Sequence, residues 1–171
     1  YSQDPVACIE ETHTSYLLNY RAFSGNNTGY QGDQLQRARE AAQLMGYTFE
    51  LQGAAMEATL TPDGEADLTL KLAVAQTGVA PFYYPLNLQV TAIQYGQTAL
   101  VSTPLEPLLP GEVEEVQIQL KNLPAAALTE PFSVELDSPI LQENQSIAWA
   151  TTTPWSTKDG PLMLLFDPEQ P

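Results

Sequence analysis

Hydrophobic and polar residues alternate along most of the chain after Gly46. Residues 68–74, for example, carry an apolar side chain at every even position, with Thr69 and Lys71 between them. A period of two is typical of strands that bury one face. The alternating runs cover residues 47–51, 56–60, 68–74, 86–90, 116–120 and 132–136, and residues 147–151 and 162–166 complete the series.

Sequences rich in Gly, Pro, Asn and Asp separate these runs and predict turns at residues 62–64, 95–97, 110–111, 122–124 and 158–161. About eight short strands, with 14 prolines and no second helix, favour a mainly β fold, an antiparallel β-sandwich of immunoglobulin or fibronectin type III kind, over residues 47–171. We expect its core to contain Phe49, Leu60, Leu70, Leu72, Leu88, Val90, Ile118, Leu120, Val134 and Leu136.

Residues 1–46 form a lead-in of one strand, one loop and one helix by the same reasoning. Residues 14–20 are apolar at their centre and rich in strand formers, which predicts a strand buried on both faces. A helix is predicted over 33–45, with Asp33 and Gln36 as a capping box and Gly46 as a left-handed C-cap. Its narrow apolar face consists of Leu35, Ala38, Ala42 and Met45.

Composition indicates a folded but strongly acidic protein. Hydrophobic residues make up 43% of the chain, and 21 acidic against 6 basic residues give a formal net charge of -15. Such a charge repels phosphate groups, so nucleic acid and anionic membranes are excluded as partners. No apolar run approaches the ~20 residues that span a bilayer, which predicts no membrane insertion. The first residue, Tyr1, is not methionine, which suggests a processed product or an excised fragment, and the acidic surface favours a protein that is secreted or lies at the cell surface.

The residues with catalytic or metal-binding chemistry do not form a convincing site. Cys8 and His13 are the sole cysteine and histidine, too few for a disulfide or a zinc cluster, and nothing in their spacing indicates a nucleophile and base. Glu10-Glu11 and Glu114-Glu115 are adjacent pairs, and neighbours on a strand point to opposite faces. We therefore expect no enzyme activity and no cofactor, and only a calcium ion in the acidic loop 63–67 stays open.

Aromatic residues are the remaining candidates for ligand binding. Tyr83 and Tyr84 follow Phe82 between two prolines, and Trp149 and Trp155 flank a threonine-rich stretch. Flat aromatic rings stack on the apolar faces of sugars, which suggests a glycan site, while packing in the core is the alternative.

Several stretches, taken together, resemble the C-terminal part of a family of uncharacterised bacterial proteins in which a glycoside-hydrolase-like (β/α)8 barrel is joined to a β-sandwich. The stretches are residues 13–20, 44–49, 76–83 (Gln-Thr-Gly-Val-Ala-Pro-Phe-Tyr) and, more loosely, 147–155 with 160–162. The resemblance implies that residues 14–20 and 33–45 are the last barrel strand and helix. Asn19, Tyr20 and Arg21 would then stand at the C-terminal end of that strand, where barrel enzymes build their sites. Ordinary packing of Tyr20 and pairing of Arg21 with an acid is the alternative. The family's catalytic carboxylates would lie in a barrel that precedes residue 1.

Two functions are compatible with these observations. The first is a non-catalytic accessory β-sandwich of an extracellular carbohydrate-active barrel protein, which supports the preceding barrel domain or binds a polysaccharide or oligosaccharide. The second is a freestanding adhesion or interaction module of the cell surface, unrelated to sugars.

Overall fold

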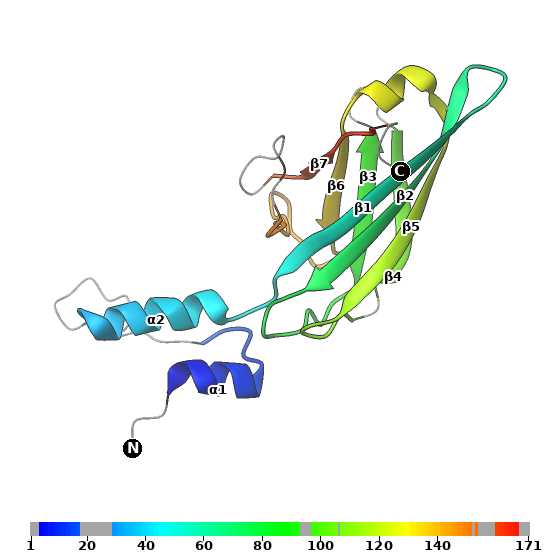
Figure 1. The fold of residues 1–171 in the computed structure, drawn as a ribbon. Helices are drawn as coiled ribbons and strands as arrows, with labels where there is room; N and C mark the ends of the chain where they lie inside the picture. Colours follow the sequence, from blue (N-terminus) through cyan, green and yellow to red (C-terminus); the bar gives the residue numbers. More distant parts are fainter. Residues whose placement is uncertain are drawn as a thin grey trace.

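A computed structural model of the chain describes residues 4–17, 29–92, 97–105, 107–151, 153 and 160–167. In this part of the chain two α-helices, α1 (Pro5–Thr12) and α2 (Asp33–Leu44), precede two antiparallel sheets. The helices lie next to each other and project from one end of the sheets (Figure 1). The prediction of a mainly β protein with few helices is therefore confirmed.

Seven strands form the two sheets within the described residues. The first sheet has the order β1-β2-β5, with β1 at Phe49–Leu60, β2 at Glu65–Gln76 and β5 at Val113–Pro124. The second has the order β4-β3-β6-β7, with β3 at Leu86–Ala92, β4 at Gln97–Leu105, β6 at Phe132–Asp137 and β7 at Leu162–Leu164. A short 3-10 helix, η1 (Ala125–Thr129), connects β5 to β6.

The two sheets share one hydrophobic core, which the alternating residues supply. In β2 the even-numbered residues from Ala66 to Gln76 are buried, and they face buried residues of β3 and β6 such as Val90 and Val134. Nine of the ten predicted core residues are buried. Leu60 is the exception at 66% exposed. It ends β1 at the tip of the β1-β2 hairpin, which extends past the second sheet, so nothing covers its side chain (Figure 1).

The two predicted runs at 47–51 and 56–60 belong to a single strand, β1. Its pairing with β2 shifts between Leu51 and Gly53, so Gln52 is an extra residue in a bulge. An extra residue reverses which positions face inward. Phe49 and Leu51 point to the core before the bulge, and Met56 does so after it, which is why the alternation changed from odd to even positions.

Four other strand and turn predictions need correction. β4 was not predicted, and Gln97, which we assigned to a turn, begins it. Residues 122–124 lie inside β5, where Leu123 is fully buried and a second register shift absorbs the left-handed Asn122. The predicted strand 147–151 makes one isolated bridge, from Ile147 to Leu136, and β7 ends at Leu164. The turns at 62–64 and 110–111 are present, with positive φ angles of 83° at Gly64 and 86° at Gly111.

The lead-in also differs from expectation. Residues 14–17 are not a strand, and the rest of the predicted strand, 18–20, lies outside the described residues. The helix α1 was missed, although Asp4 and Pro5 begin it: the Asp4 carboxylate accepts a hydrogen bond from the N–H of Val6 at 3.0 Å.

Helix α2 begins after Gly32, and no side chain caps it, so Asp33 and Gln36 do not form the predicted capping box. Gln36 instead donates to the Glu40 carboxylate at 2.9 Å, one helical turn away. The buried face contains Ala41, because α2 packs against α1, and the predicted Ala42 is exposed. Gly46 has the expected positive φ, 100°, but Met45 before it is extended, so Gly46 directs the chain toward the sheets rather than capping the helix.

Candidate functional site

The joint between the lead-in and the sheets is built around the side chain of Gln76, the last residue of β2. Gln76 is fully buried. Its Oε1 accepts hydrogen bonds from the N–H groups of Thr48 (3.1 Å) and Gly78 (2.5 Å). Its Nε2 donates to the carbonyl of Ala80 at 2.6 Å. One buried amide thus connects the segment that enters β1 to the loop that leaves β2.

Gly78 lets these two segments approach closely. A Cβ atom at this position would lie 2.5 Å from the nitrogen of Thr48, 2.6 Å from the carbonyl oxygen of Gly46 and 2.7 Å from the carbonyl carbon of Tyr47. All three are backbone atoms, which cannot move aside by changing a rotamer. Only glycine fits here without displacing the backbone.

The helix pair is attached to the same point. The N–H of Gly46 donates to the carbonyl of Thr14 at 3.2 Å, and its carbonyl accepts from the N–H of Ala80 at 3.0 Å. The Nδ1–H of His13 donates to the carbonyl of Val79 at 2.7 Å. Both helices therefore contact the loop that follows β2 through hydrogen bonds close to their ends.

The loop at residues 77–85, which we call the tyrosine loop, presents aromatic side chains at this end of the sheets. Phe82 is buried, and the ring of Tyr47 lies 4.7 Å and that of Tyr84 5.7 Å from its centroid, both edge to face. Tyr47 is 43%, Tyr84 53% and Tyr83 70% exposed. Buried Phe49 packs on the inner side of Phe82 at 5.9 Å. Tyr47 and Tyr84 thus pack against the buried ring of Phe82 and stay partly exposed, while Tyr83 beside them is more exposed still.

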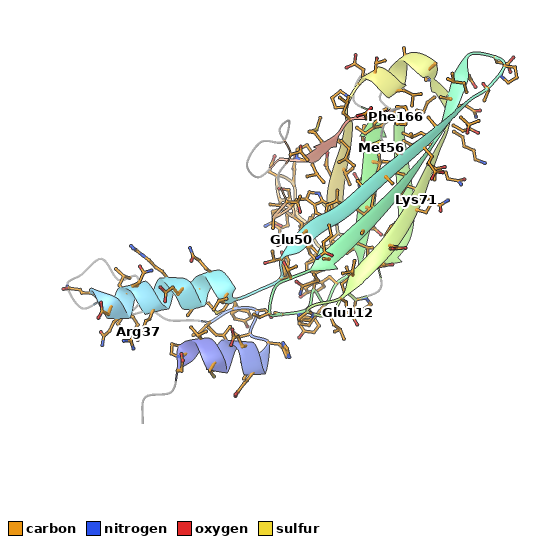
Figure 2. All side chains as sticks on the ribbon, viewed as in Figure 1. Arg37, Glu50, Met56, Lys71, Glu112 and Phe166 are labelled. Carbon is orange, nitrogen blue, oxygen red and sulfur yellow. The ribbon has the colours of Figure 1, made fainter. Side chains whose placement is uncertain are left out.

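More large apolar side chains are exposed at this end of the molecule. They include Tyr16 and Leu17, which follow α1, and Leu109 and Val113, which flank the turn between β4 and β5. This turn is tied to Gln76, whose carbonyl accepts from the N–H of Gly111 at 2.8 Å. Figure 2 shows Glu50 and Glu112 at the same end of the sheets, with Lys71 farther along the first sheet and Arg37 out on α2.

Of the two tryptophan candidates, Trp149 is described, and it does not join the tyrosines. Trp149 is only 8% exposed, and its Nε1–H donates to the carbonyl of Val134 at 2.9 Å, so its ring faces belong to the core. The segment around it closes the open edge between the sheets: Ala150 donates to the carbonyl of Phe49, and Thr151 Oγ1 accepts from Leu51 N–H at 2.7 Å. Four other candidates, Asn19, Tyr20, Arg21 and Trp155, lie outside the described residues.

The carboxylates do not converge within the described part of the chain. Glu10 and Glu11 lie on the helix α1 rather than on a strand, and both are exposed. Glu114 and Glu115 are neighbours on β5. Of the predicted loop 63–67, residues 65–67 belong to β2, where the Asp67 carboxylate accepts from the N–H of Asn122 at 3.0 Å. The described residues contain no group of three or more His, Cys, Asp or Glu side chains able to hold a metal ion.

Sequence reasoning did not single out two residues of the joint, Gln76 and Gly78. They appeared only within residues 76–83, one of the stretches that carry the family resemblance. The signal available was a polar amide and a glycine placed directly after an apolar strand, a pattern that turns share. Tyr47 was assigned to a strand, and its exposure came from the structure.

No helix among the described residues is long and apolar enough to span a membrane. Comparison of the chain with protein-family models, with curated proteins and with solved structures finds no match.

Proposed function

We propose that this chain is a non-catalytic accessory module of an extracellular carbohydrate-active, barrel-type protein, and that it binds glycan through its exposed tyrosines. The exposure of Tyr83 and Tyr84 on a loop held by buried hydrogen bonds carries this proposal. Rigid aromatic rings provide contact area at little cost in conformational entropy, and the phenol oxygens add hydrogen bonds to sugar hydroxyls.

The fold proposed for the module is a sandwich of fibronectin type III kind. The first, second and fifth strands form one sheet, and the fourth, third, sixth and seventh form the other. In an immunoglobulin constant-type domain the fourth strand belongs to the sheet of the first two. Here β4 pairs with β3 instead, and this pairing supports the fibronectin type III kind over the immunoglobulin constant type. Folds of this kind occur widely as accessory and adhesion modules, so the fold itself selects neither function.

Attachment to a larger domain is supported by the packing of the helices. Among the described residues of the lead-in only Ile9 and Ala41 are buried apolar side chains. Helices of 8 and 12 residues are marginal by themselves, and this small contact adds little. Tyr16 and Leu17 stay exposed beside them, as expected for a surface that another domain covers.

The alternative function is an adhesion or interaction module of the cell surface whose partner is a protein. The same tyrosines suit this role, because tyrosine is enriched in protein interfaces. What separates the two is whether the tyrosines bind free polysaccharide.

Affinity electrophoresis in gels that contain soluble polysaccharides tests the proposal. We expect at least one neutral or cationic polysaccharide to retard the chain, and Tyr83→Ala with Tyr84→Ala to abolish most of the retardation. Two stacked rings contribute about 0.5–1.5 kcal/mol each, so binding weakens by about 5- to 150-fold.

The matched controls are Tyr84→Phe, which keeps the ring, and Leu60→Ala, which removes an exposed apolar side chain at the far end of the sheets. The Leu60 variant is expected to bind as the parent does, and Tyr84→Phe to lose only the contribution of one phenol hydrogen bond, about 0.5–1.5 kcal/mol or roughly 2- to 13-fold. Absence of retardation on a broad panel, or equal loss in the Leu60 variant, contradicts glycan binding by the tyrosines and favours the interaction module.

A further inference from the structure

We propose that Gln76 is a positioning residue: its buried side-chain amide, with Gly78 beside it, holds the helix pair and the tyrosine loop to the two sheets as one rigid unit. The proposal goes beyond the function above, because it concerns the orientation of α1 and α2 relative to the sheets and requires no ligand.

The hydrogen bonds of Gln76 reach three segments at this end of the molecule: the entry to β1, the tyrosine loop and the turn between β4 and β5. Its side chain bonds the backbone of Thr48, Gly78 and Ala80. Its own N–H donates to the carbonyl of Glu112 at 3.0 Å, which adds the turn between β4 and β5. Full burial means that water cannot replace these bonds when one of them breaks.

The connection between the joint and the helices is short and held by hydrogen bonds. Thr48 follows the end of α2 by four residues, and Gly46 between them is bonded on both sides, to Thr14 and to Ala80. The close contact of Gly78 with residues 46–48 leaves no room for these segments to slide past each other. His13 adds a second tie from the end of α1 to Val79. A flexible linker would show none of these contacts.

The alternative is that Gln76 only stabilises the end of β2. The two roles differ in what the removal of the amide changes. A stabilising residue affects the free energy of unfolding of the sheets, whereas a positioning residue affects the orientation of the helices while the sheets stay folded.

Distance measurement between two spin labels separates these outcomes. Cysteines replace exposed Gln43 on α2 and exposed Gln119 on β5 in a Cys8→Ser background, and double electron–electron resonance reports the distance distribution. We expect one narrow peak in the parent and loss of that peak in Gln76→Leu. The matched control is Gln117→Leu on the exposed face of β5, which should keep the narrow peak.

Amide hydrogen exchange provides a second measurement on the same variants. The N–H groups of Thr48 and Gly78 donate hydrogen bonds to Oε1 of Gln76. Their protection from exchange should fall by roughly 5- to 150-fold in Gln76→Leu, as for one buried group left unsatisfied. The amide of Ala150, which bonds Phe49, should keep its protection and shows that the sheets remain folded.

Gln76→Glu keeps the proposal testable if the leucine variant does not fold. An ionised carboxylate accepts from Thr48 and Gly78 but cannot donate to Ala80, whereas a protonated carboxyl group can. Full burial and the facing carbonyl of Ala80 disfavour the charged form of the introduced group. They outweigh the two N–H donors that favour it, so its pKa is raised above the unfolded value of about 4.3. Below about pH 4.3 the introduced carboxyl group is protonated, donates to Ala80 and keeps the distance distribution narrow. As the pH rises through the raised folded-state pKa, this hydrogen bond is lost and the distribution broadens.

Three titratable side chains are bonded within this segment: His13 to Val79, Glu50, which accepts from Thr77 Oγ1 at 3.1 Å, and Glu112, whose carboxylate accepts from the N–H of Leu109 at 2.9 Å. These side chains are the same in the parent and in Gln76→Glu. The pH dependence of the parent's distance distribution is therefore subtracted from that of the variant. A narrow peak in Gln76→Leu with folded sheets, a broad peak in the parent, or a pH-independent distribution in Gln76→Glu would overturn the proposal. Loss of glycan binding alone changes none of these results.

Discussion

Replacing Gly78 with alanine adds a methyl group where the backbone of residues 46–48 already lies. The new carbon atom would stand 2.5–2.7 Å from three backbone atoms, whereas nonbonded carbon atoms rest at about 3.5–4.0 Å. The two segments must therefore separate by roughly 1 Å. Overpacking of this kind costs about 1–3 kcal/mol, and weakening the bond from Gly78 to Gln76 adds about 1 kcal/mol. Alanine also lowers the conformational entropy of the unfolded chain, which stabilises the folded protein by about 0.4–1 kcal/mol. We expect a net destabilisation of about 1–3 kcal/mol.

Gly53→Ala is the matched control, because it makes the same chemical change in β1. Its new methyl group would meet only the Cβ of Ala73, at an ordinary contact distance of 3.7 Å. We expect this variant to be more stable than the parent by about 0.5–1 kcal/mol, since glycine weakens a strand. Urea unfolding followed by circular dichroism and tryptophan fluorescence gives both free energies. Equal effects of the two substitutions, or a change below about 0.5 kcal/mol for Gly78→Ala, would refute the contact geometry of the joint.

Two further predictions concern the sheets. Trp149→Phe removes the indole donor to the buried carbonyl of Val134 and part of a buried ring, so calorimetry should show a loss of about 1–3 kcal/mol, and an unchanged melting temperature would contradict the placement of Trp149 in the core. Lys71→Ala breaks the 2.8 Å ion pair with Glu57, in which the Lys71 and Glu57 side chains are 53% and 62% exposed. The free energy of unfolding should change by less than about 0.5–1 kcal/mol. A larger loss would show that this pair is not a solvent-screened surface contact.

Sequence reasoning recovered the parts of the fold that depend on neighbouring residues. The strand β2 was readable because its even positions face one core along its whole length. β1 was read as two runs because a single extra residue, Gln52, changes the face that each later residue presents. Leu60 has the pattern of a core residue, but whether the second sheet covers the hairpin tip depends on distant residues. The alternation within one strand does not predict the length of the strands in the facing sheet, and that length decides whether Leu60 is covered.

The candidate site was predictable only in part for the same reason. Two prolines and consecutive aromatic residues identified Tyr83 and Tyr84, and both are exposed. Trp149 offered an equally good aromatic signal, yet the bond to Val134 places it in the core. A ring that packs and a ring that binds have the same local sequence, and burial by distant strands distinguishes them.

The sequence by itself determined the mainly β character after Gly46, the inward residues of most strands, the acidic charge and the helix that begins at Asp33, because periodicity, charge and turn chemistry act over a few residues. Only the tertiary structure decided the joint. The amide of Gln76 bonds Thr48, 28 residues earlier in the chain, and the lack of a side chain at Gly78 matters because residues 46–48 lie against it. Such contacts form when the folded chain brings distant segments together, and a polar residue near a glycine gives no sign of them in advance.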